Sequence, residues 1–288
     1  MDVSIIFRSC DTVDCFSGSK RIVTTTKQEL ILRSLNSLLR SMAVANSCYG
    51  EDSKDELEMD LTIIDDHSTD ETQDRMDKLC RSWGYNPRML QVEGEGNGDS
   101  LKTNYEWALD HGKSLLFFVE DDYIHHCDML LESLEFYANN VGVRPGMNDM
   151  VVHPCDYPDR YYKALHTSWI LPGKARHWRS IKQTTCTFLM SRNTLEEHWD
   201  KYMGFTQYGK DPGVTEDTTI NRVYDKVNCF SPMPTLSLHL QFDTCISPFT
   251  DWEAWWEANK IDLDELSIGS GGLHPSIFST ESSPKITE

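Results

Sequence analysis

One apolar run ends abruptly in three acids, and this feature constrains the fold more than any other. Residues 115–119 read Leu-Leu-Phe-Phe-Val and are followed directly by Glu120, Asp121 and Asp122. Such a run is typical of a buried strand in a parallel sheet, and ligands of open α/β sheets bind beyond the carboxyl ends of the strands. Carboxylates there suit Mg²⁺ or Mn²⁺ carrying a phosphorylated compound. The run therefore predicts a sheet edge that binds a metal and a phosphorylated ligand.

Hydrophobic periods alternate along the first half, which predicts an α/β fold built from βαβ units. Apolar residues within 27–45 recur at helical spacing, and Ser68-Thr69-Asp70-Glu71 matches a capping box. Strands are expected at 3–7, 61–64, 88–92 and 114–119, and helices at 27–45, 68–83 and 100–111.

The second half is less regular but continues the sheet. The expected helices are 129–139, one capped at 193–196, 216–227 and 251–260, and the expected strands are 150–152, 184–190 and 236–240. The aromatic and basic stretch 155–182 is expected to be loop-like, and the Gly-, Ser- and Pro-rich tail 267–288 to be mobile.

Composition limits the possible partners and compartments. The formal net charge of −19 disfavours nucleic acid and anionic membranes as partners. No run of roughly eighteen apolar residues is present, so no transmembrane segment is expected. The N-terminus lacks a secretory signal pattern, and the nine cysteines include no Cys-x-x-Cys pair. Both observations favour a cytoplasmic protein with reduced thiols.

One segment opposes the general acidity. Residues 160–192 contain seven Lys or Arg residues and no Asp or Glu. Together with a cation at the strand-end carboxylates, this segment is a candidate for holding a diphosphate. A solvated basic surface explains the same composition equally well.

A second predicted strand also ends in acids, because residues 61–64 are followed by Asp65 and Asp66. Parallel strands share one carboxyl edge, so this pair and the 120–122 triplet are expected on the same rim, with the glycine-rich loop 94–99 between them. A single acidic strand end can be explained as a helix cap. Two acidic strand ends on the same edge of the sheet favour a ligand-binding site. One cluster would hydrogen-bond a nucleobase and ribose, and the other would bind the metal.

The order and spacing of these motifs resemble family 2 glycosyltransferases of the GT-A fold. The matching segments are Val3–Arg8, Ile63–Thr72 with its Asp-Asp-x-Ser-Thr-Asp pattern, Asn97-Gly98 with Asn104, the acid triplet, and Val214–Arg222 with a Glu-Asp pair. The resemblance implies one GT-A domain over 1–266, a Rossmann-like mixed central sheet flanked by helices. Residues 1–125 would bind a nucleotide-sugar, with uracil, the commonest base in the family, as the expected base. Residues 126–266 would bind the acceptor and carry catalysis.

The resemblance also implies which residues bind the nucleotide. They come from the ends of the first two strands, the glycine loop and the triplet: Arg8, Ser9, Asp65, Asp66, Gly98, Lys102 and Asp121. Asp65 would read the base and Asp121 would face the ribose. Gly98 and Lys102 would close over the nucleoside or diphosphate.

Three residues are implied as ligands of Mn²⁺ or Mg²⁺. Asp122 would bind the metal directly. The family usually has Asp where this chain has Glu120, whose longer side chain would reach the ribose or metal through water. His239 falls where many GT-A enzymes place a histidine ligand. A hydrogen-bonded histidine on a half-buried strand is the alternative interpretation of His239.

An inverting transfer needs a base that deprotonates the acceptor hydroxyl. The resemblance gives this role to Asp217, with Glu216 orienting it or acting as the base itself. The alternative is a pair of first-turn acids favoured by the helix dipole. On the acceptor side, a glycan or another hydroxyl compound, the aromatic residues Tyr161-Tyr162, Trp169 and Trp178 are candidates for a sugar-stacking wall, or for core packing.

Two other functions remain open at this stage. A nucleotidyltransferase on a related α/β fold would use the acids for phosphoryl transfer and needs a basic, glycine-rich N-terminal signature, to which residues 15–20 are a faint match. A non-catalytic domain that keeps the nucleotide pocket would lack a base, whereas Asp217 stands where one is expected.

Overall fold

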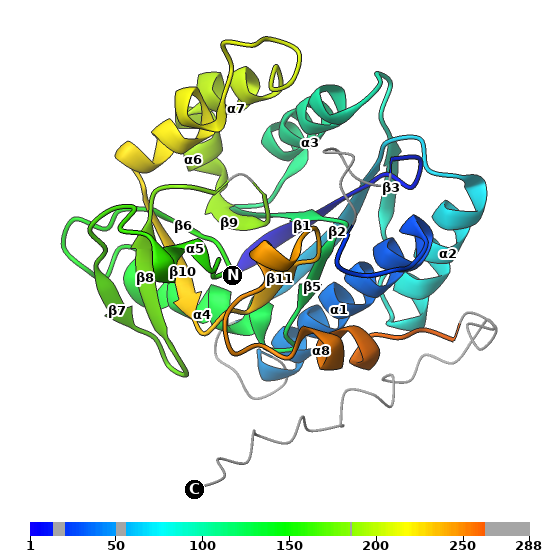
Figure 1. Cartoon of the computed structure of the whole chain (residues 1–288), viewed down its shortest axis with the longest axis horizontal. Helices are drawn as coiled ribbons and strands as arrows, with labels where there is room; N and C mark the ends of the chain where they lie inside the picture. The colour runs from blue at the N-terminus through cyan, green and yellow to red at the C-terminus, as the bar shows by residue number, and fades with distance from the viewer. Residues whose placement is uncertain (14–20, 50–55, 185, 263–288) are drawn as a thin grey trace, which may run out of the picture.

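The computed structural model describes residues 1–13, 21–49, 56–184 and 186–262, through which a nine-stranded mixed sheet runs (Figure 1). Its strand order is β3-β2-β1-β4-β9-β6-β10-β8-β7. The strands β3, β2, β1 and β4 are mutually parallel, and β9 runs antiparallel to both β4 and β6. Helices flank the sheet, which confirms the predicted α/β class with a mixed central sheet.

The bounds of the elements are as follows. The strands are β1 (Asp2–Ser9), β2 (Glu58–Asp65), β3 (Arg88–Gln91), β4 (Leu115–Glu120), β5 (Tyr123–His125), β6 (Met150–Val152), β7 (Ile170–Pro172), β8 (His177–Ile181), β9 (Phe188–Ser191), β10 (Asn228–Met233) and β11 (Ser237–His239). The helices are α1 (Lys27–Cys48), α2 (Asp70–Ser82), α3 (Asn97–His111), α4 (Met129–Asn140), α5 (Asp159–Tyr162), α6 (Arg192–Glu197), α7 (Trp199–Phe205) and α8 (Trp252–Ala258).

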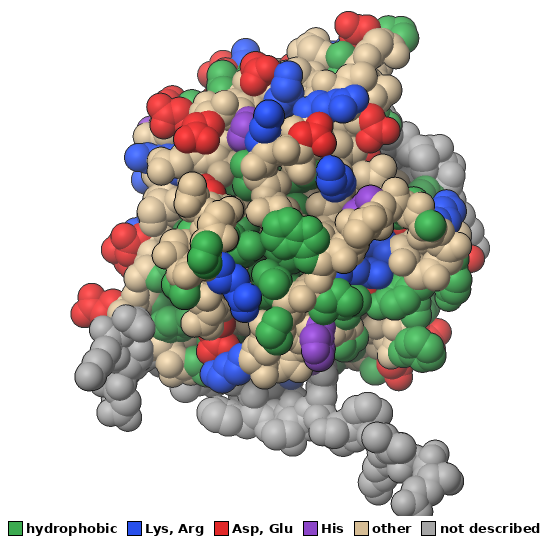
Figure 2. Space-filling model, turned by 90° about the vertical axis from the view of Figure 1, so that its left-hand side faces the viewer, with side chains coloured by type: hydrophobic (Ala, Val, Ile, Leu, Met, Phe, Trp, Pro, Cys, Tyr) green, Lys and Arg blue, Asp and Glu red, His purple; other side chains and the backbone are tan. Residues whose placement is uncertain are grey.

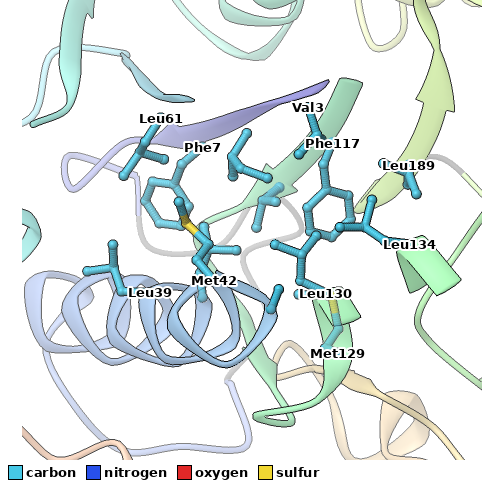
Figure 3. Packing of buried hydrophobic residues seen from close by; sticks show 14 of the residues in the cluster. Val3, Phe7, Leu39, Met42, Leu61, Phe117, Met129, Leu130, Leu134 and Leu189 are labelled. Atoms are coloured by element: carbon cyan, nitrogen blue, oxygen red, sulfur yellow. The ribbon is translucent and has the colours of Figure 1, made fainter. Parts of the chain in front are cut away.

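Alternation along the central strands divides the core between the two faces of the sheet. Val3 and Phe7 of β1 pack on one face against α1, where Leu39 and Met42 lie beneath them, and α2 and α4 cover the same face (Figure 3). Ile6 points to the other face, which α3, α6 and α7 cover. Because both faces are buried, the central strands are mostly apolar, as parallel strands of α/β proteins are.

Strand register brings the acidic strand ends together. β1 lies between β2 and β4, with Ser9 opposite Asp65 and Arg8 opposite Glu120. β5 begins directly after the acid triplet and pairs with β11. The N–H of Leu240 donates to the backbone oxygen of Asp122 at 2.9 Å. The topology thus places β11, from the C-terminal part of the chain, beside the end of β4.

Parts of the second half differ from the sequence prediction. The stretch 155–182 is not a loop, because α5, β7 and β8 lie within it. Residues 216–227 form two 3₁₀ helices, η1 (Glu216–Thr218) and η2 (Ile220–Asp225), rather than an α-helix. The cap of α6 is Ser191, whose Oγ accepts a hydrogen bond from the N–H of Thr194 at 3.0 Å, and not Asn193.

Some predictions fall on other parts of the chain or stay untested. The tail 267–288 and the faint signature 15–20 lie outside the described residues. No described helix combines the length and apolar character needed to cross a bilayer. The sheet joins the two predicted halves, since β4 pairs with β9, but the bounds of the 1–266 domain remain a prediction.

Candidate functional site at the carboxyl edge of the sheet

A cavity of about 300 Å³ opens at the carboxyl ends of β1 and β4, and we call it the rim cavity. Six of the residues predicted for the nucleotide and the metal line it: Arg8, Ser9, Asp66, Glu120, Asp121 and Asp122. Asp65, Gly98, Lys102 and His239 are not among its described lining residues. The two acidic strand ends therefore meet at one site.

Asp65 is fully buried and its carboxylate is used inside the protein. Its Oδ1 accepts a hydrogen bond from Ser9 Oγ at 2.9 Å, and its Oδ2 accepts one from the N–H of Ser68 at 3.0 Å. These bonds fix the turn after β2 and tie it to the end of β1. The next residue, Asp66, is the one that faces the rim cavity.

Arg8 and Glu120 form a two-point ion pair across the register of β1 and β4. Arg8 Nε and Nη2 donate to the two oxygens of Glu120 at 3.0 and 2.5 Å. Arg8 Nη1 also donates to Asn97 and Ser100 of α3. Burial raises the pKa of Glu120, and the Arg8 charge opposes that rise. Because both oxygens of Glu120 are engaged, this carboxylate anchors Arg8 in the structure.

The other two acids of the triplet are paired with basic side chains that the sequence did not single out. Asp121 accepts hydrogen bonds from Lys27 Nζ at 2.5 Å and from the N–H of Cys10 at 2.9 Å. Asp122 Oδ2 accepts one from Arg21 Nη1 at 3.0 Å. Both Lys27 and Arg21 line the rim cavity.

His239 lies beside Asp122, although 117 positions separate them in the chain. Its Nε2 is 3.2 Å from Asp122 Oδ2, and its Nδ1 is 3.1 Å from the hydroxyl of Tyr157. The ring stacks on Tyr123 at 4.5 Å between centroids. Burial opposes protonation of this imidazole, but the charge and hydrogen bond of Asp122, together with Cys245, outweigh it and raise the pKa of His239 to about 10. Two tyrosines therefore hold the imidazole with one nitrogen facing Asp122.

Asp122 and His239 form a donor set that suits a divalent cation once the cation displaces the proton from His239 Nε2. Neighbouring ligands of one such cation lie about 3 Å apart when each is about 2.1 Å from the metal, and the two atoms here are 3.2 Å apart. Carboxylate oxygen and imidazole nitrogen are both ligands of Mn²⁺. Glu120 adds nothing to this set while Arg8 occupies both of its oxygens.

Gly98 and Lys102 lie on α3, and each contacts neighbours outside the rim cavity. A Cβ on Gly98 would lie 2.2 Å from the backbone oxygen of Thr206, so this glycine allows α3 to pack closely on the chain after α7. Lys102 is half exposed and its Nζ lies 3.7 Å from Glu106, one helical turn away. The structure thus gives Gly98 a packing role.

Gly98→Ala is therefore expected to destabilise the fold by about 1–3 kcal/mol, the usual cost of overpacking a close contact. The measurement is the free energy of unfolding in urea. Gly213→Ala is the matched control, since its Cβ would meet only the side chain of Asp211, at 3.3 Å. Equal stability of the Gly98 variant and the wild type would contradict this packing role.

Asp217 belongs to a second cavity, of about 290 Å³, which shares no described lining residue with the rim cavity, and Glu216 is not among the described lining residues of either. Asp217 is exposed, lines this second cavity and accepts a hydrogen bond from Asn221 Nδ2 at 2.9 Å. Glu216 is partly buried, and burial together with the Asp217 charge raises its pKa. The oxygen of Asn221 accepts from the N–H of Thr184 at 3.3 Å.

The basic segment 160–192 does not reach the rim cavity, because none of the described lining residues comes from it. Its charges are matched elsewhere. Arg176 pairs with Glu132 of α4, Arg179 with the buried Asp156. The cations of the rim cavity come instead from β1, from the chain before α1 and from α1 itself.

The aromatic residues proposed for the acceptor side divide into two groups. Trp178 is buried and stacks on Phe136 at 4.3 Å, so it is a core residue. Tyr162 and Trp169 are 77% and 54% exposed. They belong to the side of the molecule formed by α5, β7 and β8, and Figure 2 shows hydrophobic side chains gathered on this face with Lys and Arg around them.

Comparisons with known proteins find no match in sequence and only distant matches in structure. No protein-family model matches the chain, and no curated protein matches it in sequence. Among solved structures, S. aureus TarS 1–349, also solved with UDP, shares 14% identity over 80% of this chain and 60% of its own, with a TM-score of 0.46. The glycosyltransferase GlyE of Streptococcus pneumoniae shares 10% identity over 91% and 61%, with a TM-score of 0.48.

The galactosyltransferase LgtC, solved with donor and acceptor sugar analogues, shares 10% identity over 78% of this chain and 72% of its own, with a TM-score of 0.42. The chain spans about 60% of the length of the TarS and GlyE chains. These identities and TM-scores are too low to carry an argument about activity, so the function rests on the chain's own motifs and on the rim cavity.

Proposed function

We propose that this chain is a metal-dependent, inverting glycosyltransferase of the family 2 type. It would move a sugar from a nucleoside diphosphate sugar, with UDP as the first candidate, to a hydroxyl of a glycan or another acceptor. The observation that carries the proposal is the convergence of Asp122 and His239 to 3.2 Å at the end of β4, beside a cavity. The motifs that line this cavity are those that resemble the family.

The charge of the cavity supports a bound cation. Its described lining residues include three cations and four carboxylates: Arg8, Arg21, Lys27, Asp66, Glu120, Asp121 and Asp122. Their sum is −1, which would repel a diphosphate, whereas one divalent cation makes it +1. In this proposal Asp122 and His239 hold Mn²⁺ or Mg²⁺, and phosphate oxygens and water complete the coordination. When bound, the cation would offset charge on the departing diphosphate.

Nucleotide recognition would use the residues at the ends of β1 and β2. Asp66 faces the cavity and offers a carboxylate to the N–H groups of a base or to ribose hydroxyls. Asp65 would act through the turn that it fixes with Ser9 and Ser68. Arg8, held by Glu120, forms part of the wall.

Asp217 would accept the proton of the acceptor hydroxyl as that oxygen attacks the anomeric carbon. Glu216, whose raised pKa favours the protonated form, would orient Asp217 or share the proton. Attack on the face opposite the departing diphosphate inverts the anomeric configuration. The exposed rings of Tyr162 and Trp169 are candidates to stack on acceptor sugars, because aromatic rings cover the apolar C–H faces of pyranoses.

The experiment is a turnover assay with Mn²⁺ and a panel of nucleotide-sugars and glycan acceptors, in which the released product is identified. Release of a nucleoside diphosphate and formation of a β-linked product from an α-linked donor are expected. Release of pyrophosphate would instead indicate a nucleotidyltransferase. Tight nucleotide binding without turnover would indicate a non-catalytic domain, and no binding of any nucleotide would sink the proposal.

A further inference from the structure

Two cations of the rim cavity are buried to an unusual degree. The side chains of Arg21 and Lys27 are only 8% and 9% exposed, yet both line the cavity. Arg and Lys are almost never buried without a partner, and a buried ion pair by itself is weak evidence of added stability. Here each has a carboxylate partner, Asp122 for Arg21 and Asp121 for Lys27. Because both cations also line the cavity, they offer positive charge to an anion that enters it.

We propose that Arg21 and Lys27 form a phosphate-binding pair that holds the diphosphate of the nucleotide, and that Asp122 and Asp121 position them. This inference rests on the proposed function, because it takes the ligand of the rim cavity to be a nucleoside diphosphate. It gives the two acids a second task besides contact with metal and ribose. It also assigns residues that no sequence motif indicated.

The hydrogen bonds of Arg8 and Lys27 separate a structural role from a binding role. Arg8 donates to both oxygens of Glu120 and to Asn97 and Ser100, which fixes its whole guanidinium within the protein. Lys27 Nζ has one described hydrogen bond, to Asp121, and an ammonium carries three donors. Its remaining donors can reach a phosphate oxygen without breaking the pair with Asp121.

Asp121 and Asp122 hold the ends of Lys27 and Arg21 at the rim cavity. The N–H of Cys10, the residue after β1, donates to Asp121 Oδ2 at 2.9 Å. This bond places Asp121, and with it the ammonium of Lys27, at the carboxyl end of β1. Asp122 Oδ2 accepts from Arg21 Nη1 and also lies 3.2 Å from His239 Nε2, so Arg21 meets the proposed metal site at this oxygen. A diphosphate that contacts a cation at Asp122 would therefore meet Arg21 and Lys27 on the same side.

The local chain supports an anion at this place. Lys27 is the first residue of α1, a helix of 22 residues capped by Thr26. The N-terminal end of a helix carries partial positive charge and favours phosphate groups. The side chain of Lys27 adds a full charge to that end, at the point where the helix meets the rim cavity.

The test measures how affinity depends on the number of phosphates. Calorimetry would first find which of UDP, GDP, ADP, CDP and dTDP the wild type binds best, and would then compare that diphosphate with its monophosphate and its nucleoside. Arg21→Gln and Lys27→Gln are each expected to weaken diphosphate binding about 10- to 100-fold and to change nucleoside affinity less than about twofold. Lys78→Gln, at a half-exposed position on α2, is the matched control and is expected to bind like the wild type.

Two further variants protect the result against a folding defect. Lys27→Arg keeps the charge and is expected to retain most of the diphosphate affinity. The double variant Lys27→Gln/Asp121→Asn removes both charges of the buried pair, so it avoids an uncompensated carboxylate, and it is expected to lose diphosphate affinity while its melting temperature stays near that of the wild type.

Equal losses for the nucleoside and the diphosphate would overturn the inference, as would unchanged diphosphate affinity in both Gln variants. In either case the wild type would still bind a nucleotide, so the proposed function would stand. A wild type that binds none of the five diphosphates would remove both.

Discussion

Asp122→Asn is expected to lower the rate of sugar transfer on the order of 10²–10³-fold, the usual loss when one electrostatic contact to the leaving group is removed. The carboxylate is the member of the proposed pair of metal ligands that brings negative charge to the cation, and its neighbour His239 lies 3.2 Å away. An amide offers an oxygen without charge, so both the cation and Arg21 lose their partner. Initial rates of nucleoside diphosphate release measure the effect.

Manganese affinity provides an independent measurement on the same variant. Titration of Mn²⁺ followed by electron paramagnetic resonance, with nucleotide present, is expected to show at least a tenfold weaker site. Asp110→Asn, at an exposed position of α3, is the matched control and should behave as the wild type. A wild-type rate together with wild-type Mn²⁺ affinity in Asp122→Asn would remove this residue from the metal site.

Asp217→Asn is expected to reduce transfer on the order of 10²–10⁴-fold, the range for loss of a general base. Nucleotide affinity should stay unchanged, because Asp217 lines the second cavity and not the rim cavity. Transfer rates and calorimetric binding of the diphosphate, measured on the same preparation, separate the two effects.

Glu216→Gln is the companion variant, since Glu216 lies next to Asp217 and its pKa is raised. A smaller loss is expected for this change if Glu216 only orients its neighbour. Wild-type transfer by Asp217→Asn, or a large loss confined to Glu216→Gln, would take the base role away from Asp217.

The sequence predicts the fold well where hydrophobic period is strong. Each element predicted for the first half is present, because β1, β2 and β4 are buried on both faces and α1 repeats its apolar residues along one side. The short strand β5 was not predicted. The prediction fails within 155–182, where β8 contains Arg179. This charge suggests a loop, but in the structure it is buried against Asp156. A pairing between distant residues overrode the local pattern.

The candidate site is predictable in part for the same reason. Strand ends determine where Asp66 and the triplet lie, and the parallel sheet places them on one rim. The basic side chains that pair with these acids could not be predicted from the sequence. The sequence around Arg21 and before Lys27 has no hydrophobic period, and nothing local indicates that these side chains face β4. The pair of Arg8 and Glu120 depends on the register between β1 and β4, which a pattern of residues does not specify.

The most direct test of the central claim is a crystal structure with Mn²⁺ and the preferred nucleotide. The account predicts a diphosphate in the rim cavity, and an anomalous peak about 2–2.3 Å from an oxygen of Asp122 and from Nε2 of His239. An empty rim cavity, with nucleotide or metal bound elsewhere and His239 still hydrogen-bonded to Asp122, would contradict it.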